Sequence, residues 1–315
     1  MHSLEPEYVE LAAANVIDEP TALRAIALER GEIFSVFEEI RFALYGAVAA
    51  ITAGVGILVK QNLDHIGPLT LILTLVLAAA ACYATAIRTR LRRAPRSIGG
   101  DYVLLLGALI VSADLGYTES QFHWLGTHWS WYLLILAAMH AATAYTLDSR
   151  LVLSVALTSL AGWFGLEGHI GSLMQLDGVI RNSGAQAMLC AGVILLWRLI
   201  HGRLGGAVQF IDVFEHFAAN LGFWGALALC GSPDTRWMAV VALVAFAIVS
   251  IRHGLRTGQE AFVIYGIGYA AFGLCIVEAQ TIGETVIAVA MALGTVVAAL
   301  ILLWQFHQRL KAIAA

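Results

Sequence analysis

The sequence predicts an all-α polytopic bundle of transmembrane helices, and three observations support this fold class. The chain has 315 residues, of which 60% are hydrophobic and only 13% are charged, whereas a soluble domain is about 25% charged. Its apolar residues form continuous runs, not the alternating pattern of a transmembrane β-barrel. Ten of these runs approach the length of about 20 residues that a helix needs to cross a bilayer. The composition therefore excludes a soluble globular, a disordered or a fibrous protein.

The ten apolar runs are the expected spans, and they follow one another with short connections after residue 40. They are Phe42–Val59, Leu69–Ile87, Tyr102–Tyr117, Trp131–Leu147, Leu151–Leu166, Gly184–Ile200, Ile211–Cys230, Trp237–Ile251, Ala261–Gln280 and Val286–Trp304. The seventh run begins with charged residues, so the sequence leaves open whether it crosses the membrane fully or lies partly at the interface.

The distribution of lysine and arginine predicts the orientation, because cytoplasmic loops retain positive charge. An even number of spans puts both termini on one side, and the segments on that side contain 15 of the 18 basic residues. The opposite loops contain only Lys60, Arg181 and Arg236. We therefore expect both termini in the cytoplasm.

The densest run of basic residues lies between the second and third predicted spans. Its members are Arg88, Arg90, Arg92, Arg93 and Arg96. One interpretation is a contact site for anionic lipid headgroups, where each basic residue adds about 1 kcal/mol. The alternative is a topology signal that stops translocation, which needs no bound lipid.

Residues 1–40 are expected to form a cytoplasmic helical segment in front of the membrane bundle of residues 41–315. This segment contains nine carboxylates and no apolar stretch typical of a cleavable signal peptide. Asp18 followed by Glu19 and Pro20 predicts a helix start, and Gly31 predicts a break. With few large apolar side chains, the segment is too small for a core of its own. We expect a hairpin at the cytoplasmic ends of the bundle, with docking of a protein partner as the alternative role.

The seventh predicted span separates aromatic and polar side chains onto two faces, given about 100° per residue. One face carries a stripe of large apolar side chains: Phe210, Phe214, Phe217, Leu221 and Trp224. The opposite face carries a candidate polar cluster: Asp212, Glu215, His216 and Asn220. One interpretation is a proton or cation relay that lines a cavity, since histidine can titrate near neutral pH. The alternative is a helix start at the interface, where headgroup water and the helix dipole favour carboxylates.

Three further polar groups in the apolar runs are secondary candidates. Asp114 and Glu278 fall near the outer ends of the third and ninth predicted spans, where an interfacial carboxylate is the alternative to a functional one. His140 is central in the fourth span, between small residues that let another helix approach closely. An interhelical hydrogen bond is the alternative to a ligand role for this histidine.

The ninth predicted span carries small residues that predict a position inside the bundle. Gly266, Gly268 and Gly273 allow close helix crossing, which drives association in lipid. Tyr265 and Tyr269 lie one turn apart, and their hydroxyl groups need hydrogen-bond partners.

The sequence contains no motif for a cofactor, a metal or catalysis, so we expect none of these. GxxxxGK[ST], HExxH, GxSxG and CxxCH are missing. No two of the four cysteines are closer than 40 residues, which favours buried free thiols. His123 and His128 share an outer loop but fall short of the three or four donors that zinc requires. A net charge of −4 offers no basic surface for nucleic acid.

Several stretches between residues 10 and 170 carry a family resemblance. They are Gly46…Gly54-Val-Gly56, residues 61–68 (QNLDHIGP), residues 99–108 (GGDYVLLLGA), residues 131–140 (WYLLILAAMH) and residues 148–163 (DSRLVLSVALTSLAGW). This pattern resembles bacterial multi-pass proteins of the domain-of-unknown-function 2157 family. The resemblance implies a multi-pass topology and a bacterial inner-membrane location, and it implies no particular activity.

Two functional classes remain for this membrane protein. The first is a carrier or permease-like protein for a small solute, ion or lipid, with the polar face of the seventh span along its path. The second is a non-catalytic scaffold that docks a partner through residues 1–40. Few charged groups lie deep in the spans, and an enzyme is not expected. Membrane lipids are partners in either case.

Overall fold

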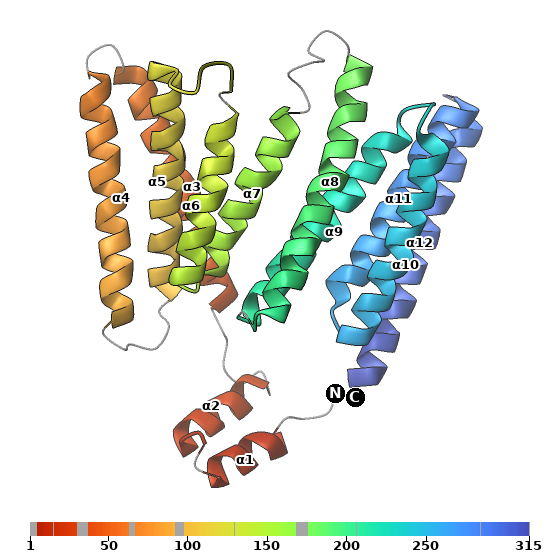
Figure 1. Cartoon of the computed structure of the whole chain (residues 1–315). Helices are drawn as coiled ribbons and strands as arrows, with labels where there is room; N and C mark the ends of the chain where they lie inside the picture. The colour runs from red at the N-terminus through yellow and green to blue at the C-terminus, as the bar shows by residue number, and fades with distance from the viewer. Residues whose placement is uncertain are drawn as a thin grey trace.

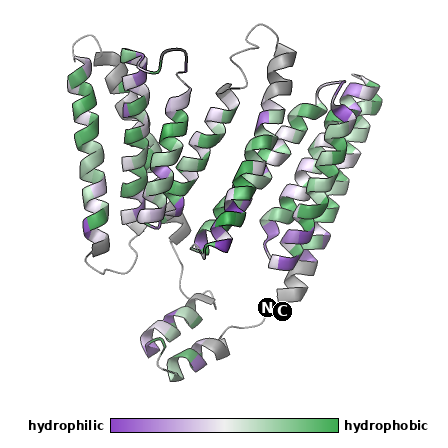
Figure 2. Cartoon of the chain, in the orientation of Figure 1, coloured by the Kyte–Doolittle hydropathy of each residue, from purple (hydrophilic) through white to green (hydrophobic). Residues whose placement is uncertain are grey.

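The computed structural model describes residues 5–14, 16–29, 37–62, 67–91, 98–128, 130–167, 176–205, 207–283 and 285–314. Every regular element within these ranges is a helix, which confirms the all-α fold class. Figure 2 shows apolar residues along the middle of the bundle helices and hydrophilic residues mostly toward their ends, as expected of helices that pass through lipid.

The N-terminal segment forms two short helices, α1 (Glu5–Ala13) and α2 (Glu19–Glu29), which pack on each other. The carbonyl of Asp18 accepts hydrogen bonds from the amides of Thr21 and Ala22 at 3.0 and 3.1 Å. The predicted helix start at this position is therefore confirmed, whereas the break predicted at Gly31 lies outside the described residues. Figure 1 shows the two helices below the bundle.

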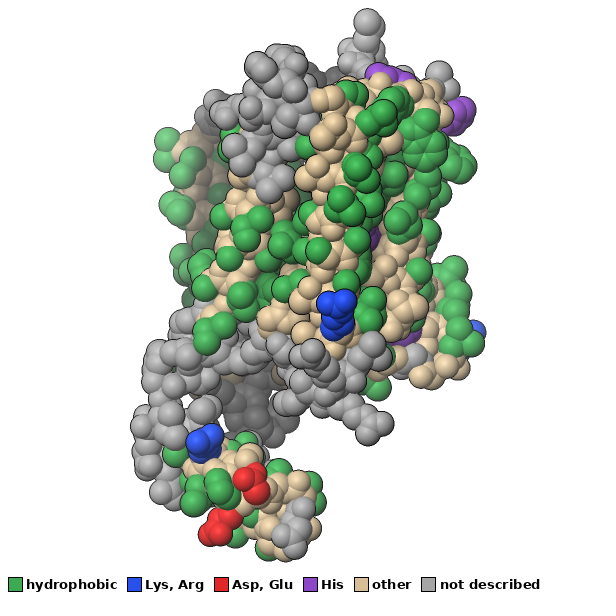
Figure 3. All heavy atoms as spheres, turned by 90° about the vertical axis from the view of Figure 1, so that its left-hand side faces the viewer, with side chains coloured by type: hydrophobic (Ala, Val, Ile, Leu, Met, Phe, Trp, Pro, Cys, Tyr) green, Lys and Arg blue, Asp and Glu red, His purple; other side chains and the backbone are tan. Residues whose placement is uncertain are grey.

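Ten longer helices follow in the described residues, and each predicted apolar run falls on one of them in order. They are α3 (Phe37–Asn62), α4 (Pro68–Leu91), α5 (Ile98–Phe122), α6 (Trp131–Thr146), α7 (Arg150–Glu167), α8 (Leu176–Arg203), α9 (Gln209–Cys230), α10 (Arg236–Thr257), α11 (Glu260–Ile282) and α12 (Val286–Ala314). Helix α3 begins and α12 ends at the same end of the bundle (Figure 1). On the face shown in Figure 3, hydrophobic side chains cover much of the bundle, and the carboxylates in view lie on the N-terminal helices.

Within the described residues, seven helices are long and apolar enough to cross a membrane: α4, α5 and α8 to α12. The apolar parts of α3 and α7 are shorter, at Phe42–Gly54 and Arg150–Gly165, and α6 has 16 residues. The chain is thus a multi-pass membrane protein. The count of ten spans and the cytoplasmic side of both termini stay predictions.

Helix α9 is the central helix of the bundle. Of its apolar stretch, 44% is buried, against 11% to 28% in the other six long apolar helices that the structure describes. Phe210 and Phe214 from its aromatic stripe are almost fully buried, in a core that includes residues of α4 to α8. The stripe predicted from the sequence therefore joins the two halves of the chain. Trp224, at the far end of the stripe, is 57% exposed.

The glycines of α11 divide between two faces. Gly266 and Gly273 are buried against α10, and a Cβ atom at Gly266 would lie 2.7 Å from Ile251 Cγ1 and 2.9 Å from the Ala247 carbonyl oxygen. The predicted close crossing is confirmed there. Gly268 is exposed, with open space around it, so the prediction of an internal position is wrong for this residue.

Candidate functional site around helix α9

The sequence of α9 gives this helix three faces with different partners. Apart from Trp224, its aromatic stripe packs into the core that it forms with α4 to α8. A second face carries small residues, Ala218 and Gly222, with Glu215 one turn closer to the helix start. A third face carries His216 and Asn220, which contact α11. Because α9 lies among four other helices, each face is buried by a different neighbour.

The Glu215 carboxylate contacts side chains of two other helices at once. Arg198 Nη2 on α8 donates to Glu215 Oε1 at 2.6 Å, and His253 Nε2 on α10 lies 3.1 Å from Glu215 Oε2. The Glu215 side chain is 12% exposed, while each partner is 33% exposed. Charge-assisted hydrogen bonds of this kind are shorter and stronger than neutral ones. Both carboxylate oxygens of Glu215 are therefore engaged.

The other members of the predicted cluster bind elsewhere. His216 Nδ1 lies 3.2 Å from the Tyr265 hydroxyl, and the His216 ring stacks on Phe262 with centroids 4.8 Å apart. The Tyr269 hydroxyl donates to Asn220 Oδ1 at 2.7 Å. The two tyrosine hydroxyls thus find the partners that the sequence predicted they need. Asp212, at the start of α9, accepts a long hydrogen bond of 3.4 Å from Gln259.

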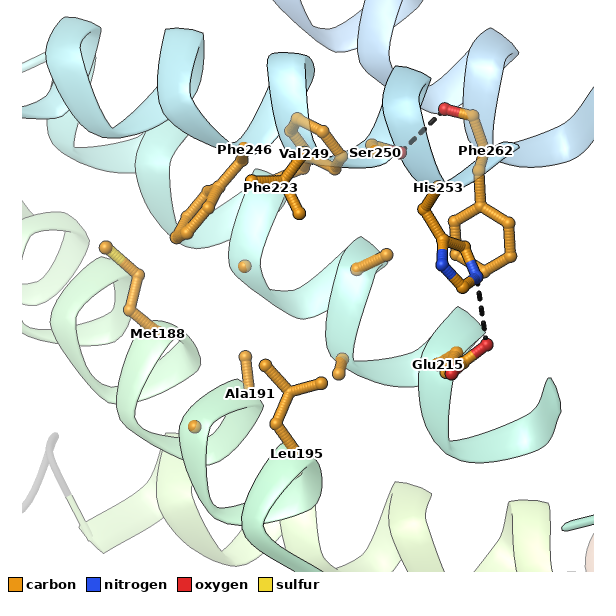
Figure 4. Close-up of a pocket in the computed structure, with 14 residues that line it drawn as sticks. Met188, Ala191, Leu195, Glu215, Phe223, Phe246, Val249, Ser250, His253 and Phe262 are labelled. Carbon is orange, nitrogen blue, oxygen red and sulfur yellow. Dashed lines mark hydrogen bonds and ion pairs between the residues drawn. The ribbon is translucent and has the colours of Figure 1, made fainter. Parts of the chain in front are cut away.

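A cavity of about 320 Å³ lies between α8, α9 and α10, with one residue of α11 at its end. Figure 4 shows Glu215 and His253 at one end of the cavity and Met188 and Phe246 at the other. The middle of the floor consists of small residues of α9, and most of the wall residues are apolar. The lining residues are Met188, Ala191, Gly192, Leu195, Glu215, Ala218, Ala219, Gly222, Phe223, Phe246, Val249, Ser250, His253 and Phe262.

Of the four residues in the predicted polar cluster, Glu215 lines this cavity, whereas Asp212, His216 and Asn220 are not among its lining residues. The expectation that His216 and Asn220 lie along a solute path therefore finds no support in the described part of the chain. Their contacts instead hold α9 against α11.

Sequence reasoning missed the two residues that pair with Glu215. In the sequence, Arg198 is one of the 15 basic residues that predict the orientation, and no pattern there points to His253. A signal was present, because Arg198 and Glu215 are nearly equally distant from the turn between α8 and α9. In an antiparallel helical hairpin, residues equally distant from the turn lie at the same height.

The secondary candidates lie apart from this cavity. His140 on α6 is 1% exposed and its Nε2 lies 2.9 Å from Ser112 Oγ on α5, an interhelical hydrogen bond. Asp114 Oδ1 is buried without a hydrogen-bond partner among the described residues. Glu278 Oε1 accepts a hydrogen bond from Thr295 on α12 at 2.9 Å.

The lipid-contact candidates lie at the end of α4. Arg88 and Arg90 belong to the last turns of that helix, and Arg88 is exposed. Arg92, Arg93 and Arg96 lie outside the described residues. The interpretation as a lipid-contact site stays a prediction.

The arrangement around Glu215 is suited to binding a small molecule. The cavity can hold an apolar group beside a fixed pair of charges. Among the residues that the structure describes, no three histidine, cysteine, aspartate or glutamate side chains come together in a way that can hold a metal ion.

Comparison with known proteins gives a family match for the N-terminal part of the chain. Residues 10–153 match the model of a family described as predicted membrane protein (DUF2157), which confirms the resemblance found in the sequence. The matched residues end within α7, so the Glu215 cavity lies beyond them. No curated protein and no solved structure matches the chain. The chain is therefore a multi-pass membrane protein whose residues 10–153 are similar to the DUF2157 family of predicted membrane proteins.

Proposed function

We propose that this chain is a carrier-like membrane protein that takes a small amphipathic molecule into the cavity between α8, α9 and α10. The supporting observation is a single carboxylate, Glu215, which is ion-paired to Arg198 on α8 and lies 3.1 Å from His253 on α10, at one end of a mostly apolar cavity. Ionisable side chains at membrane depth cost about 2.5–3.5 kcal/mol on insertion scales, and they face a cavity or a charged partner. Glu215 does both.

The proposed carrier does not use His216 and Asn220 as a relay. Both side chains are hydrogen-bonded to tyrosines of α11, and neither lines the cavity. The groups proposed to contact the bound molecule are Glu215 and His253, with Arg198 acting through Glu215.

The proposal includes a topology. In it, α3 to α12 each cross the bacterial inner membrane and both termini lie in the cytoplasm. The arginine-rich ends of α4 and α8 then face the cytoplasm, as the bias of basic residues requires. The charged end of the cavity, near Arg198 and Glu215, lies toward the cytoplasmic side in this arrangement.

A scaffold role is the second candidate, and one observation favours it. The N-terminal hairpin exposes apolar side chains, with Val9, Val16 and Leu23 each more than half exposed. Exposed apolar side chains on so small a unit suit contact with a partner surface. Loss of a co-purifying protein on deletion of residues 1–29, with the cavity variants unaffected, would favour this role.

Native mass spectrometry of the protein in lipid nanodiscs tests the carrier proposal. We expect the wild-type chain to carry a stoichiometric small molecule, and the isosteric variant Glu215→Gln to lose most of it. Glu278→Gln is the matched control, because Glu278 lies on another helix and is not among the lining residues. A wild-type protein with no bound molecule, or equal occupancy in both variants, contradicts the proposal.

A further inference from the structure

We infer that the molecule held between α8, α9 and α10 is a primary amine that carries a single alkyl chain. This inference rests on the proposed carrier function and names its substrate class. The juxtaposition behind it is a narrow, mostly apolar trough, the cavity described above, that ends at the Glu215 carboxylate and the His253 ring. Both groups offer hydrogen-bond acceptors at that end.

The three polar side chains that line the trough have their own protons already engaged. Ser250 Oγ donates to the Phe262 carbonyl oxygen at 2.6 Å. A neutral His253 that donates from Nε2 to Glu215 Oε2 keeps Nδ1 as an acceptor. A carboxylate only accepts, and of its roughly four lone-pair positions Arg198 and His253 use two. The headgroup that fits this end is therefore a hydrogen-bond donor.

The charge that a headgroup meets in the trough favours a cation. Among the lining residues, Glu215 is the only aspartate, glutamate, lysine or arginine. Arg198 contacts Glu215 from α8 and is not a lining residue, so a headgroup that touches Glu215 from the trough lies closer to the carboxylate than to the guanidinium. Because Coulomb energy falls with distance, the attraction exceeds the repulsion. A protonated primary amine meets both conditions, since an ammonium group is a cation with three donors and no acceptor.

The two acceptor residues are close enough for one ammonium group to contact both. His253 Nε2 lies 3.1 Å from Glu215 Oε2. Figure 4 shows the other ring nitrogen of His253 on the side of the apolar lining residues, away from its contact with Glu215. An amine at this end therefore points its alkyl chain along the trough toward Met188 and Phe246, which lie at the opposite end.

The dimensions of the trough fit one alkyl chain. The floor runs along α9 from Glu215 to Phe223, a length of about 12 Å at about 1.5 Å per residue. A volume of about 320 Å³ has room for about ten groups of the size of a water molecule, which takes about 30 Å³ in the liquid. A methylene group is of similar size. One chain of about ten carbons therefore fills the trough, and a second chain has no room.

The walls of the trough let such a chain enter from the side. Leu195 on α8 and Val249 on α10 line it and are 46% and 66% exposed. Gly192 on α8 also lines it and is exposed, with open space at its Cβ position. These residues are on the surface that faces lipid when α8 and α10 span the bilayer. An amphiphile already dissolved in the bilayer can reach the trough without crossing water.

Equilibrium binding of radiolabelled decylamine tests this inference. The protein is placed in nanodiscs of zwitterionic phosphatidylcholine, and displaceable label is measured by scintillation proximity at pH 8, where a primary alkylamine, like the lysine side chain, is protonated. We expect unlabelled decylamine to displace the label at concentrations at least ten-fold below those of three competitors of the same chain length. Decyltrimethylammonium has the charge without the donors, decanol has one donor without the charge, and decanoate has the opposite charge.

A pair of carboxylate variants tests the headgroup contact. Glu215→Gln removes the charge of the lining carboxylate and is expected to weaken decylamine binding at least ten-fold. Glu278→Gln, on another helix and outside the lining residues, is expected to leave it unchanged. Equal weakening by the two variants would contradict recognition of the amine by Glu215.

A pair of glycine variants locates the alkyl chain. Gly192→Phe puts a ring into the mouth of the trough, and Gly268→Phe puts the same ring on the exposed face of α11. Neither Cβ atom would have a neighbour within 4 Å, so both variants are expected to fold. We expect Gly192→Phe to reduce decylamine binding at least ten-fold and Gly268→Phe to leave it unchanged. Equal binding by the two variants would place the chain outside this trough.

The outcomes separate the inference from the proposed function. If one of the three competitors displaces the label as well as decylamine does, the primary-amine class is wrong and the carrier function stands. The same holds if decylamine shows no displaceable binding while native mass spectrometry finds another small molecule that is lost in Glu215→Gln. If neither experiment finds a bound molecule, both the inference and the proposed function are wrong.

Discussion

A methyl group added at Gly225 is expected to push α8 and α9 apart. A Cβ atom at this position would lie 2.6 Å from the carbonyl oxygen of Gly184 and 3.0 Å from the amide nitrogen of Met188, both on α8. Backbone atoms cannot rotate out of the way as a side-chain end can. Ordinary contact begins at 3.4 Å, so α8 would have to move by about 0.8 Å.

The expected cost of Gly225→Ala follows from this displacement. Overpacking a well-packed core costs about 1–3 kcal/mol, and alanine recovers up to about 1 kcal/mol through its higher helix propensity. We therefore expect a net loss of about 1–2 kcal/mol of stability. Met188 lines the cavity at the end away from Glu215, so its displacement should also change the shape of the cavity.

Thermal unfolding in nanodiscs, followed by the fraction of monodisperse protein on size exclusion, measures this effect. Gly192→Ala on α8 is the matched control, since its new Cβ atom would have no neighbour within 4 Å and should leave the apparent melting temperature unchanged or slightly higher. We expect Gly225→Ala to melt several degrees below the control. Equal melting temperatures for the two alanine variants would refute the close crossing of α8 and α9.

Two further pairs of substitutions test the hydrogen bonds between helices by the same thermal assay. Tyr269→Phe removes the 2.7 Å hydrogen bond to Asn220 and should lower the free energy of unfolding by about 0.6 and at most about 1.7 kcal/mol, the measured range for such bonds in membranes. Tyr265→Phe removes a longer contact of 3.2 Å and should lower it by less. The reverse order would contradict the arrangement of α9 against α11. Ser112→Ala removes a hydrogen-bond partner of the buried His140 and should lower the free energy of unfolding by about 1–3 kcal/mol. Ser120→Ala is the control, because this exposed serine is bonded within its own helix, and it should have no measurable effect. Equal effects of the two variants would show that His140 does not depend on Ser112.

The periodicity of the sequence predicted part of the site correctly. The aromatic stripe of α9 and its opposing polar residues follow directly from helical spacing, and both faces lie where a buried central helix needs them. The same spacing could not divide the polar face further. Glu215 and His216 are adjacent in sequence, yet one turns toward α8 and α10 and the other toward α11.

By itself, the sequence determined the membrane location, the helical fold class and the order of ten apolar helices, because continuous apolar runs of this length have few stable alternatives in lipid. Only the tertiary structure decided which faces meet. Lipid tails are as apolar as leucine, so hydrophobicity does not distinguish a lipid-facing side chain from a buried one. Gly266 and Gly268 read alike in the sequence, but one packs against α10 and the other is exposed. Arg198, Glu215 and His253 likewise meet only because three helices bring them to one height beside the cavity.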